Sequence, residues 1–156
     1  MKLDDVKDII KEFTDEPIVN FQIEKSIFDQ DTGRKLYNQT IRQKVGIKHG
    51  VYIWIDKGTE EIVYIGMAGK IKNDGTLGDH SIQDRLLASR GKDKHTKTDI
   101  QTNDYIKELM VKNNIKTLGF YIIYSKQEEP PAYIEALLLY KYYKQNKRLP
   151  KFNNSF

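Results

Sequence analysis

Residues 50–66 decide the fold, and they read GVYIWIDKGTEEIVYIG. Two runs within them, 51–55 and 61–65, are rich in β-branched and aromatic residues, which is typical of β-strands. The segment Asp-Lys-Gly-Thr at 56–59 lies between the runs and is typical of a tight turn. The sequence therefore predicts an antiparallel β-hairpin at this position.

Each strand of this hairpin carries a tyrosine, Tyr52 in the first and Tyr64 in the second. Because the connecting turn is short, antiparallel pairing brings both phenols into the same small region of the sheet. Packing alone is one explanation, since tyrosine favours strands. Shared chemistry is the other, and the residues that follow the hairpin bear on the choice.

The rest of the chain predicts further helices and strands, with no repeat or clear linker between them. Apolar spacing predicts an amphipathic helix at 3–13, closed by Pro17, and alternation predicts a strand at 18–27. Residues 34–49 are polar and leave a short helix and an extended arm both open. After the hairpin we expect a loop at 69–79 and then a helix at 82–90, which starts at a Ser81–Asp84 capping pair and ends at Gly91. A helix at 103–114 and a strand at 117–124 should follow. The last expected element is a helix at 131–146, opened by Pro130 and Pro131.

Length and composition exclude several classes of protein. The 156 residues fit one domain with a real hydrophobic core. No cysteine occurs, which excludes disulfides, cysteine-ligated zinc and a thiol nucleophile, and suits the cytoplasmic location that we expect. No apolar run approaches the roughly 20 residues that span a bilayer, so we expect no membrane partner. Residues 1–13 mix acids and lysines, unlike a secretory signal.

The charge is uneven along the chain. The net charge is +4, and residues 1–49 carry nine basic and nine acidic side chains, so the whole excess lies in 50–156. Two stretches are basic, residues 85–97 and the residues after Glu135, and tyrosines are interleaved with the second. Solvated lysine-rich faces are common, but such stretches also suit a polyanion such as nucleic acid. We expect nucleic-acid contacts from Lys70, Arg90, Lys92, Lys94, Lys141, Lys144 and Arg148.

One carboxylate falls where apolar side chains are expected. On a helix, Glu135 shares a face with Leu138, Leu139 and Tyr142. Burying an unpaired carboxylate costs several kcal/mol, so the group needs a cation, hydrogen-bond donors or a proton. A structural salt bridge, for example to Arg85, and a metal site both satisfy this need.

Five features in chain order resemble the GIY-YIG nuclease superfamily, and in particular its small stand-alone members such as restriction endonucleases. They are Gly50-Val51-Tyr52, Tyr64-Ile65-Gly66, Arg85, Glu135 and Asn153. The resemblance implies a nuclease domain at 48–156 of the α/β (α+β type) class, with a small three-stranded antiparallel central sheet flanked by helices. Residues 1–47 would be an N-terminal extension, a helix and strand that extends the sheet, dimerises or reaches DNA.

The resemblance also implies catalytic roles. Tyr52 would activate the attacking water, and Tyr64 would orient the water or the phosphate. Arg85 would hold the scissile phosphate, and Glu135 would bind the divalent metal, Mg²⁺ or Mn²⁺. Asn153, or its neighbour Asn154, would brace the site.

Two further residues belong to this expected site. Lys70 lies where members often carry a basic residue, and it could contact phosphate or lower the Tyr52 pKa. Many members place a histidine four residues after the helix arginine, where this chain has Ser89 followed by Arg90. His80 is a candidate substitute, and an ordinary loop histidine is the alternative.

We therefore expect a divalent-metal-dependent endonuclease that hydrolyses DNA, restriction-like or from a mobile element. A phenol of pKa about 10 is almost fully protonated at neutral pH, so nearby cations would have to favour the phenolate. The alternatives are a non-catalytic nucleic-acid-binding domain on the same scaffold, and an unrelated basic protein whose matches are accidental. Cleavage of both strands at a palindrome would favour a homodimer by symmetry.

Overall fold

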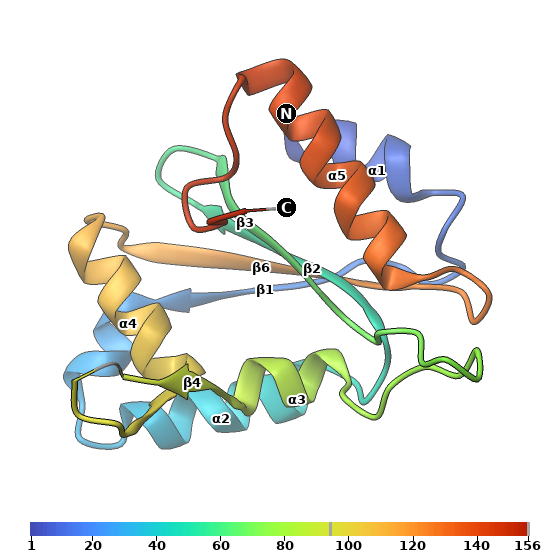
Figure 1. Cartoon of the computed structure of the whole chain (residues 1–156). Coiled ribbons are helices and arrows are strands. Elements are labelled where there is room, and N and C mark those ends of the chain that lie inside the picture. The colour runs from blue at the N-terminus through green and yellow to red at the C-terminus, as the bar shows by residue number, and fades with distance from the viewer. Residues whose placement is uncertain (94, 156) are drawn as a thin grey trace.

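The computed structural model describes residues 1–93 and 95–155. Its centre is an antiparallel sheet with the strand order β1-β6-β2-β3 (Figure 1). The strands are β1 (Val19–Glu24), β2 (Gly50–Asp56), β3 (Glu61–Ala68) and β6 (Thr117–Tyr124). The predicted hairpin of β2 and β3 is confirmed, with Trp54 opposite Tyr64 and Tyr52 opposite Gly66.

The expectation of a three-stranded sheet is wrong, because the sheet has four strands. The additional strand is β1, which pairs antiparallel with β6 from Val19 opposite Ile122 to Glu24 opposite Thr117. Its Phe21 ring stacks on Phe120 with centroids 5.0 Å apart. Pairing with β6 thus covers the apolar side chains of β1, and the N-terminal strand extends the sheet.

Helices cover both faces of the sheet (Figure 1). On one face lie α2 (Gly33–Lys44), α3 (Ile82–Leu87) and α4 (Thr102–Lys112). On the other lie α1 (Leu3–Ile10) and α5 (Pro131–Asn146). Each face has its own core, because successive strand residues point to opposite sides. Apolar burial on both faces explains why β2 is buried from Gly50 to Ile55.

Local signals predicted most elements well. The strand at 117–124 and the helix at 131–146 are confirmed, and the ambiguous segment after residue 33 is the helix α2. The Ser81–Asp84 capping pair is also confirmed, with the Asp84 amide donating to Ser81 Oγ at 3.1 Å. No helix in residues 1–93 and 95–155 is long and apolar enough to cross a membrane.

The predicted end of the third helix at Gly91 is wrong. This helix, α3, ends at Leu87, and Ala88 is already extended. The carbonyl of Ala88 accepts hydrogen bonds from the backbone amide of Thr102 at 3.1 Å and from its hydroxyl at 2.6 Å. These contacts direct the chain into a small hairpin of β4 (Ser89–Lys92) and β5 (Asp99–Gln101). A short 3₁₀ helix (Lys25–Asp29) likewise follows β1.

The C-terminal segment closes the outer edge of β3. The Phe152 amide donates to the Val63 carbonyl at 2.8 Å. The side-chain amide of Asn153 then donates to the Ile65 carbonyl at 2.7 Å and accepts from the Ile65 amide at 2.9 Å. The structure thus places Asn153 as a brace against the strand that carries Tyr64.

Replacement of Asn153 by alanine is expected to destabilise the fold. It leaves the buried amide and carbonyl of Ile65 without partners, and each such group costs about 1–3 kcal/mol. Urea unfolding of Asn153→Ala measures the loss, with Asn154→Ala as the control because Asn154 is exposed. Equal stability of the two variants would contradict the role of Asn153 as a brace.

Candidate active site

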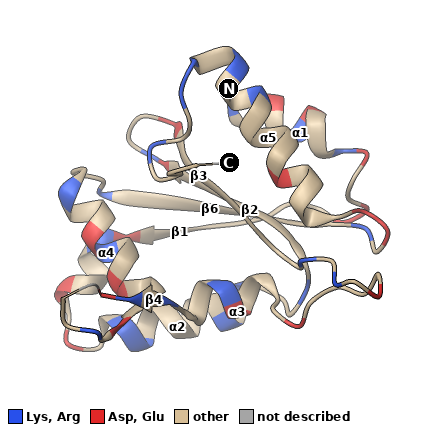
Figure 2. Cartoon of the chain, in the orientation of Figure 1, with Lys and Arg blue, Asp and Glu red and all other residues tan. Residues whose placement is uncertain are grey.

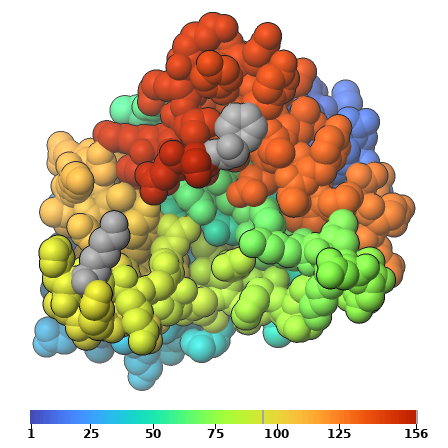
Figure 3. All heavy atoms as spheres, in the orientation of Figure 1, coloured from blue at the N-terminus to red at the C-terminus, as the bar shows by residue number. Residues whose placement is uncertain are grey.

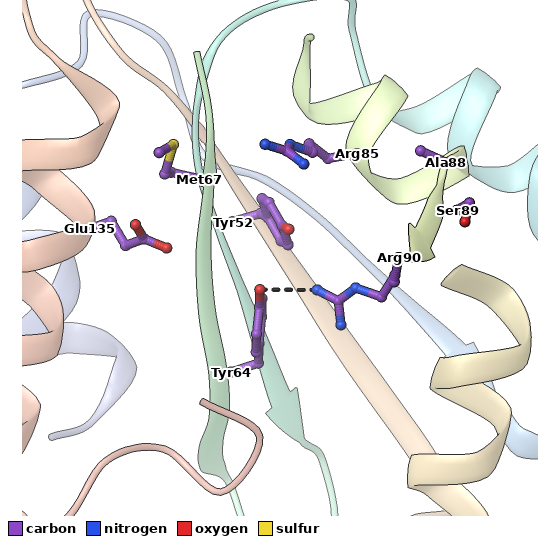
Figure 4. Close-up of a pocket in the computed structure, with 8 residues that line it drawn as sticks. All are labelled: Tyr52, Tyr64, Met67, Arg85, Ala88, Ser89, Arg90 and Glu135. Carbon is purple, nitrogen blue, oxygen red and sulfur yellow. Dashed lines mark hydrogen bonds between the residues drawn. The ribbon is translucent and has the colours of Figure 1, made fainter. Parts of the chain in front are cut away.

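Residues from both helical layers meet in one pocket beside β3. The pocket has a volume of about 380 Å³. Its lining comprises Tyr52, Tyr64, Met67, Arg85, Ala88, Ser89, Arg90 and Glu135 (Figure 4). The hairpin supplies the phenols, α3 and β4 supply the guanidinium groups, and α5 supplies the carboxylate from the opposite side. On the molecular face shown in Figure 3, the surface is hollowed between the C-terminal elements and residues 80–100.

The two phenols lean over Gly66. A Cβ atom at residue 66 would lie 2.5 Å from Tyr64 Cε1, 2.9 Å from the Tyr64 hydroxyl and 2.9 Å from Tyr52 Cζ. No real Cβ tolerates such distances, so any side chain here would displace both rings. The ring centroids of Tyr52 and Tyr64 are 5.8 Å apart. The glycine after Tyr64-Ile65 therefore has a physical reason, since it leaves room for two hydroxyl groups in one pocket.

Arg90 is a member of this site that sequence reasoning placed only among the nucleic-acid contacts. Its Nη2 donates a hydrogen bond to the Tyr64 hydroxyl at 3.0 Å (Figure 4). Its guanidinium also lies 4.4 Å from the ring centroid of Tyr105 and 5.4 Å from that of Trp54, within cation–π range. The available signal was its position beside Ser89, at the point where the nucleases that the sequence resembles often carry a histidine. The turn at Ala88 that aims Arg90 into the pocket depends on Thr102 and was not visible in the sequence.

Glu135 is half-buried and its carboxylate points into the pocket (Figure 4). Within the described part of the chain it makes no salt bridge and no hydrogen bond, so the alternative of an ion pair with Arg85 is not formed. Burial raises the pKa of Glu135, although the charges of Arg85 and Lys70 oppose this shift. The pocket thus holds a carboxylate whose charged form lacks a direct partner.

Neighbouring cations lower the Tyr52 pKa as expected, but burial has the larger effect. Burial raises the pKa of Tyr52, and the adjacent Tyr64 hydroxyl raises it further. Arg90 and Arg85 act in the opposite direction, but the ring is almost completely buried, and the desolvation of a phenolate there outweighs them. Tyr52 therefore keeps its proton in this environment.

Two residues expected at the site lie outside the pocket lining. Lys70 and His80 are both exposed on the loop after β3, and neither lines the pocket. Lys70 is close enough for its charge to act on Glu135. His80 acts on Asp84 instead, whose pKa is lowered first by the Ser81 backbone hydrogen bond and to a smaller extent by this histidine. The structure therefore gives His80 no direct place in the pocket.

The remaining expected nucleic-acid contacts are spread over the surface (Figure 2). Lys92 is exposed on β4, and Lys94 lies outside the described residues. Lys141 and Lys144 are exposed on α5, away from its buried side. Arg148 forms an ion pair with Glu61 at the start of β3. Among the members of this group that the structure describes, Arg90 alone lines the pocket.

A second pocket of about 380 Å³ continues the first along the C-terminal segment. Both are lined by Tyr64, Arg90 and Glu135, and the second adds Tyr105 and residues 152–155. The two pockets therefore adjoin at Tyr64, Arg90 and Glu135, whereas Tyr52 lines the first pocket alone. Two adjoining pockets of this kind suit a chain-like substrate that occupies both and reacts at a group between them.

Among the described residues, the pocket offers one carboxylate as a ligand for a cation, that of Glu135. Within the described residues, no group of three or more histidine, aspartate and glutamate side chains could hold a metal. Mg²⁺ does not require such a group, because it keeps several waters and takes one or two carboxylates plus substrate phosphate oxygens. The half-buried, partnerless Glu135 fits that mode of binding.

Comparison with protein-family models, with curated proteins and with solved structures found no match to this chain. The function must therefore be argued from the pocket itself.

Proposed function

We propose that this chain is a divalent-metal-dependent endonuclease of the GIY-YIG type that hydrolyses DNA phosphodiester bonds. The observation that carries the proposal is the pocket composition. Two phenols, two guanidinium groups and a partnerless carboxylate meet there from β2, β3, α3, β4 and α5. These are the groups that phosphodiester hydrolysis needs to bind phosphate, accept a proton and hold a cation.

Arg85 and Arg90 bind the phosphate in this proposal. A guanidinium offers a planar pair of donors that matches two phosphate oxygens. Arg85 is exposed and its side chain has no hydrogen bond or salt bridge within the described residues, so its donors are available. Arg90 is held by Tyr64 and Tyr105, and it stabilises charge near the Tyr64 oxygen as well as on the phosphate.

To accept the proton of the attacking water, one of the two phenols must first give its own proton to solvent. Tyr52 holds its own proton because burial raises its pKa. The Tyr64 oxygen accepts a hydrogen bond from Arg90, which stabilises negative charge on that oxygen, so in this proposal Tyr64 is the phenolate that takes the proton of the water. Tyr52, whose ring centroid lies 5.8 Å from that of Tyr64, would orient the water.

Glu135 would hold Mg²⁺ or Mn²⁺, which when bound supplies Lewis-acid stabilisation of charge on the phosphoryl oxygen. The carboxylate must be ionised to do so, and burial works against ionisation. Arg85 and Lys70 oppose this effect of burial, so they also keep Glu135 available as a ligand.

A non-catalytic nucleic-acid-binding domain is the alternative. Binding alone gains nothing from a half-buried carboxylate, which repels phosphate and costs desolvation. We therefore favour an enzyme, restriction-like or from a mobile element and acting in the cytoplasm. A homodimer would let such an enzyme cut both strands of a palindrome.

The test is nicking of supercoiled plasmid by the full chain in Mg²⁺ or Mn²⁺. We expect open-circular and then linear DNA, with no product in EDTA. Discrete fragment ends would indicate a sequence-specific enzyme. An intact plasmid in both metals, together with measurable DNA binding, would favour the non-catalytic alternative.

A further inference from the structure

The outer face of α2 is a stripe of cationic and amide side chains. Arg34, Asn38 and Arg42 lie four residues apart, and Lys35 and Gln39 follow the same spacing one residue later. These five side chains and Asp31 line a surface depression of about 560 Å³. We name Arg34, Lys35, Asn38, Gln39 and Arg42 the α2 stripe. Its members are exposed apart from Asn38, which is half-buried.

Charge is segregated within the N-terminal third of the chain. All nine acids of residues 1–49 lie at or before Asp31, and residues 32–55 carry five basic side chains and no acid. The balanced total of this region therefore hides a local excess of positive charge, which α2 carries (Figure 2). No member of the α2 stripe forms a salt bridge or a side-chain hydrogen bond within the described residues.

The helix is nevertheless fixed firmly to the core. Tyr37, fully buried on its inner side, donates a hydrogen bond to the Leu86 carbonyl at 3.0 Å. Gly33 lies so close to the preceding turn that a Cβ there would be 2.3 Å from the Ile27 carbonyl oxygen. The stripe is therefore presented on a rigid support, which distinguishes it from a mobile basic arm.

We propose that α2 is a recognition helix that inserts the α2 stripe into the major groove of duplex DNA. The major groove, about 12 Å wide, admits an α-helix. Arginine pairs with guanine there, and asparagine or glutamine pairs with adenine, through two hydrogen bonds each. Lysine supplies contacts to phosphate, and the absence of acids on α2 removes the repulsion that would oppose docking.

The position of α2 suits one duplex that reaches both surfaces. The Tyr37–Leu86 hydrogen bond ties α2 to α3 at the residue next to Arg85 in the pocket. Packed helices have axes about 8–10 Å apart, which is much less than the roughly 34 Å of one duplex turn. The inference rests on the proposed function only in taking DNA as the polymer in the pocket.

The first test is binding of a 30-base-pair DNA duplex of fixed sequence at several salt concentrations. We expect Arg34→Ala with Arg42→Ala to weaken binding and to reduce the salt slope by up to about 2, since each phosphate that an arginine neutralises on a duplex of arbitrary sequence contributes roughly 0.9. The control is Lys11→Ala with Lys107→Ala, which removes the same charge from exposed positions just after α1 and on α4. Equal affinity and slope in the two double variants would overturn the inference. Because all four positions are exposed, thermal unfolding should be the same in both.

The second test isolates base reading from charge. Asn38→Ala with Gln39→Ala leaves the net charge unchanged, so the salt slope should stay that of wild type. Selection from a pool of duplexes with a randomised centre should then return a different or relaxed sequence. Return of the wild-type sequence would overturn major-groove reading by these amides. An RNA duplex should bind more weakly, because its major groove is too deep and narrow for a helix, and equal binding would contradict the proposal.

The two proposals fail separately. If plasmid remains intact while the α2 double variant still weakens duplex binding, the nuclease assignment falls and the recognition helix stands. If plasmid is cut and the α2 variants bind as tightly and as selectively as wild type, the recognition helix falls and the nuclease stands.

Discussion

Replacement of Glu135 by glutamine is expected to abolish plasmid cleavage in Mg²⁺ and Mn²⁺. Glutamine keeps the size of the side chain but removes the one carboxylate among the described residues that line the pocket. Charge stabilisation by a bound cation is worth several kcal/mol, and each 1.36 kcal/mol is tenfold in rate, so the loss should be on the order of 10³-fold. The matched control is Glu128→Gln, at an exposed residue before α5, which should cut like wild type.

The same variant should unfold at a higher temperature than wild type at neutral pH. Burial raises the pKa of Glu135, so the folded state disfavours the charged form. The resulting cost is absent below the unfolded carboxyl pKa of about 4.3 and is complete only above the raised folded value. Glu135→Gln removes this cost, so its gain in Tm should vanish in acid.

Together these two measurements distinguish a site residue from a structural one. A residue that only stabilises the fold would lose stability and activity in parallel. Full cleavage by Glu135→Gln would contradict its role as the metal ligand. A lower Tm of that variant at neutral pH would show that the carboxylate has a stabilising partner.

Replacement of either Tyr52 or Tyr64 by phenylalanine is expected to slow cleavage by on the order of 10²–10⁴-fold, the range of general base catalysis. The effects should not multiply. Because both hydroxyls serve the same proton transfer, the double variant should be no slower than the slower single variant by more than a small factor. The matched control is Tyr140→Phe, an exposed tyrosine on α5.

Single-turnover rates across the alkaline pH range measure this coupling. The wild-type rate should rise with pH as the phenol that acts as the base loses its proton, and both single variants should change that rise. Rates that multiply in the double variant would show two independent phenols. A wild-type rate for Tyr64→Phe would remove it, with its Arg90 contact, from the mechanism.

The sequence predicted those parts of the fold that have local signals. The strand at 117–124, the helix at 131–146 and the Ser81 cap depend on residue patterns a few positions long, and all are confirmed. The strand at 18–27 was predicted, but its place in the central sheet was left open because the pairing of β1 with β6 joins segments almost 100 residues apart. Nothing in the composition of 18–27 specifies its neighbour.

For the site too, local motifs were predictable from the sequence, whereas features that depend on tertiary contacts were not. Tyr52, Tyr64, Arg85 and Glu135 were chosen by motif order, and all four line the pocket. Arg90 entered it through the early end of α3, which depends on a tertiary contact of Thr102. The cations that lower the Tyr52 pKa can be seen in the sequence, whereas the burial that raises this pKa is visible only in the structure.

The contact of Phe152 and Asn153 with β3 has a consequence for solution behaviour. Without it, β3 would present bare backbone amides and carbonyls along the rim of the sheet, and such rims recruit strands from other molecules. Proteolytic trimming after Pro150 should therefore do more than loosen Tyr64. It should also cause the protein to self-associate, because the residues after Pro150 cover the edge of β3 and so prevent intermolecular β-pairing.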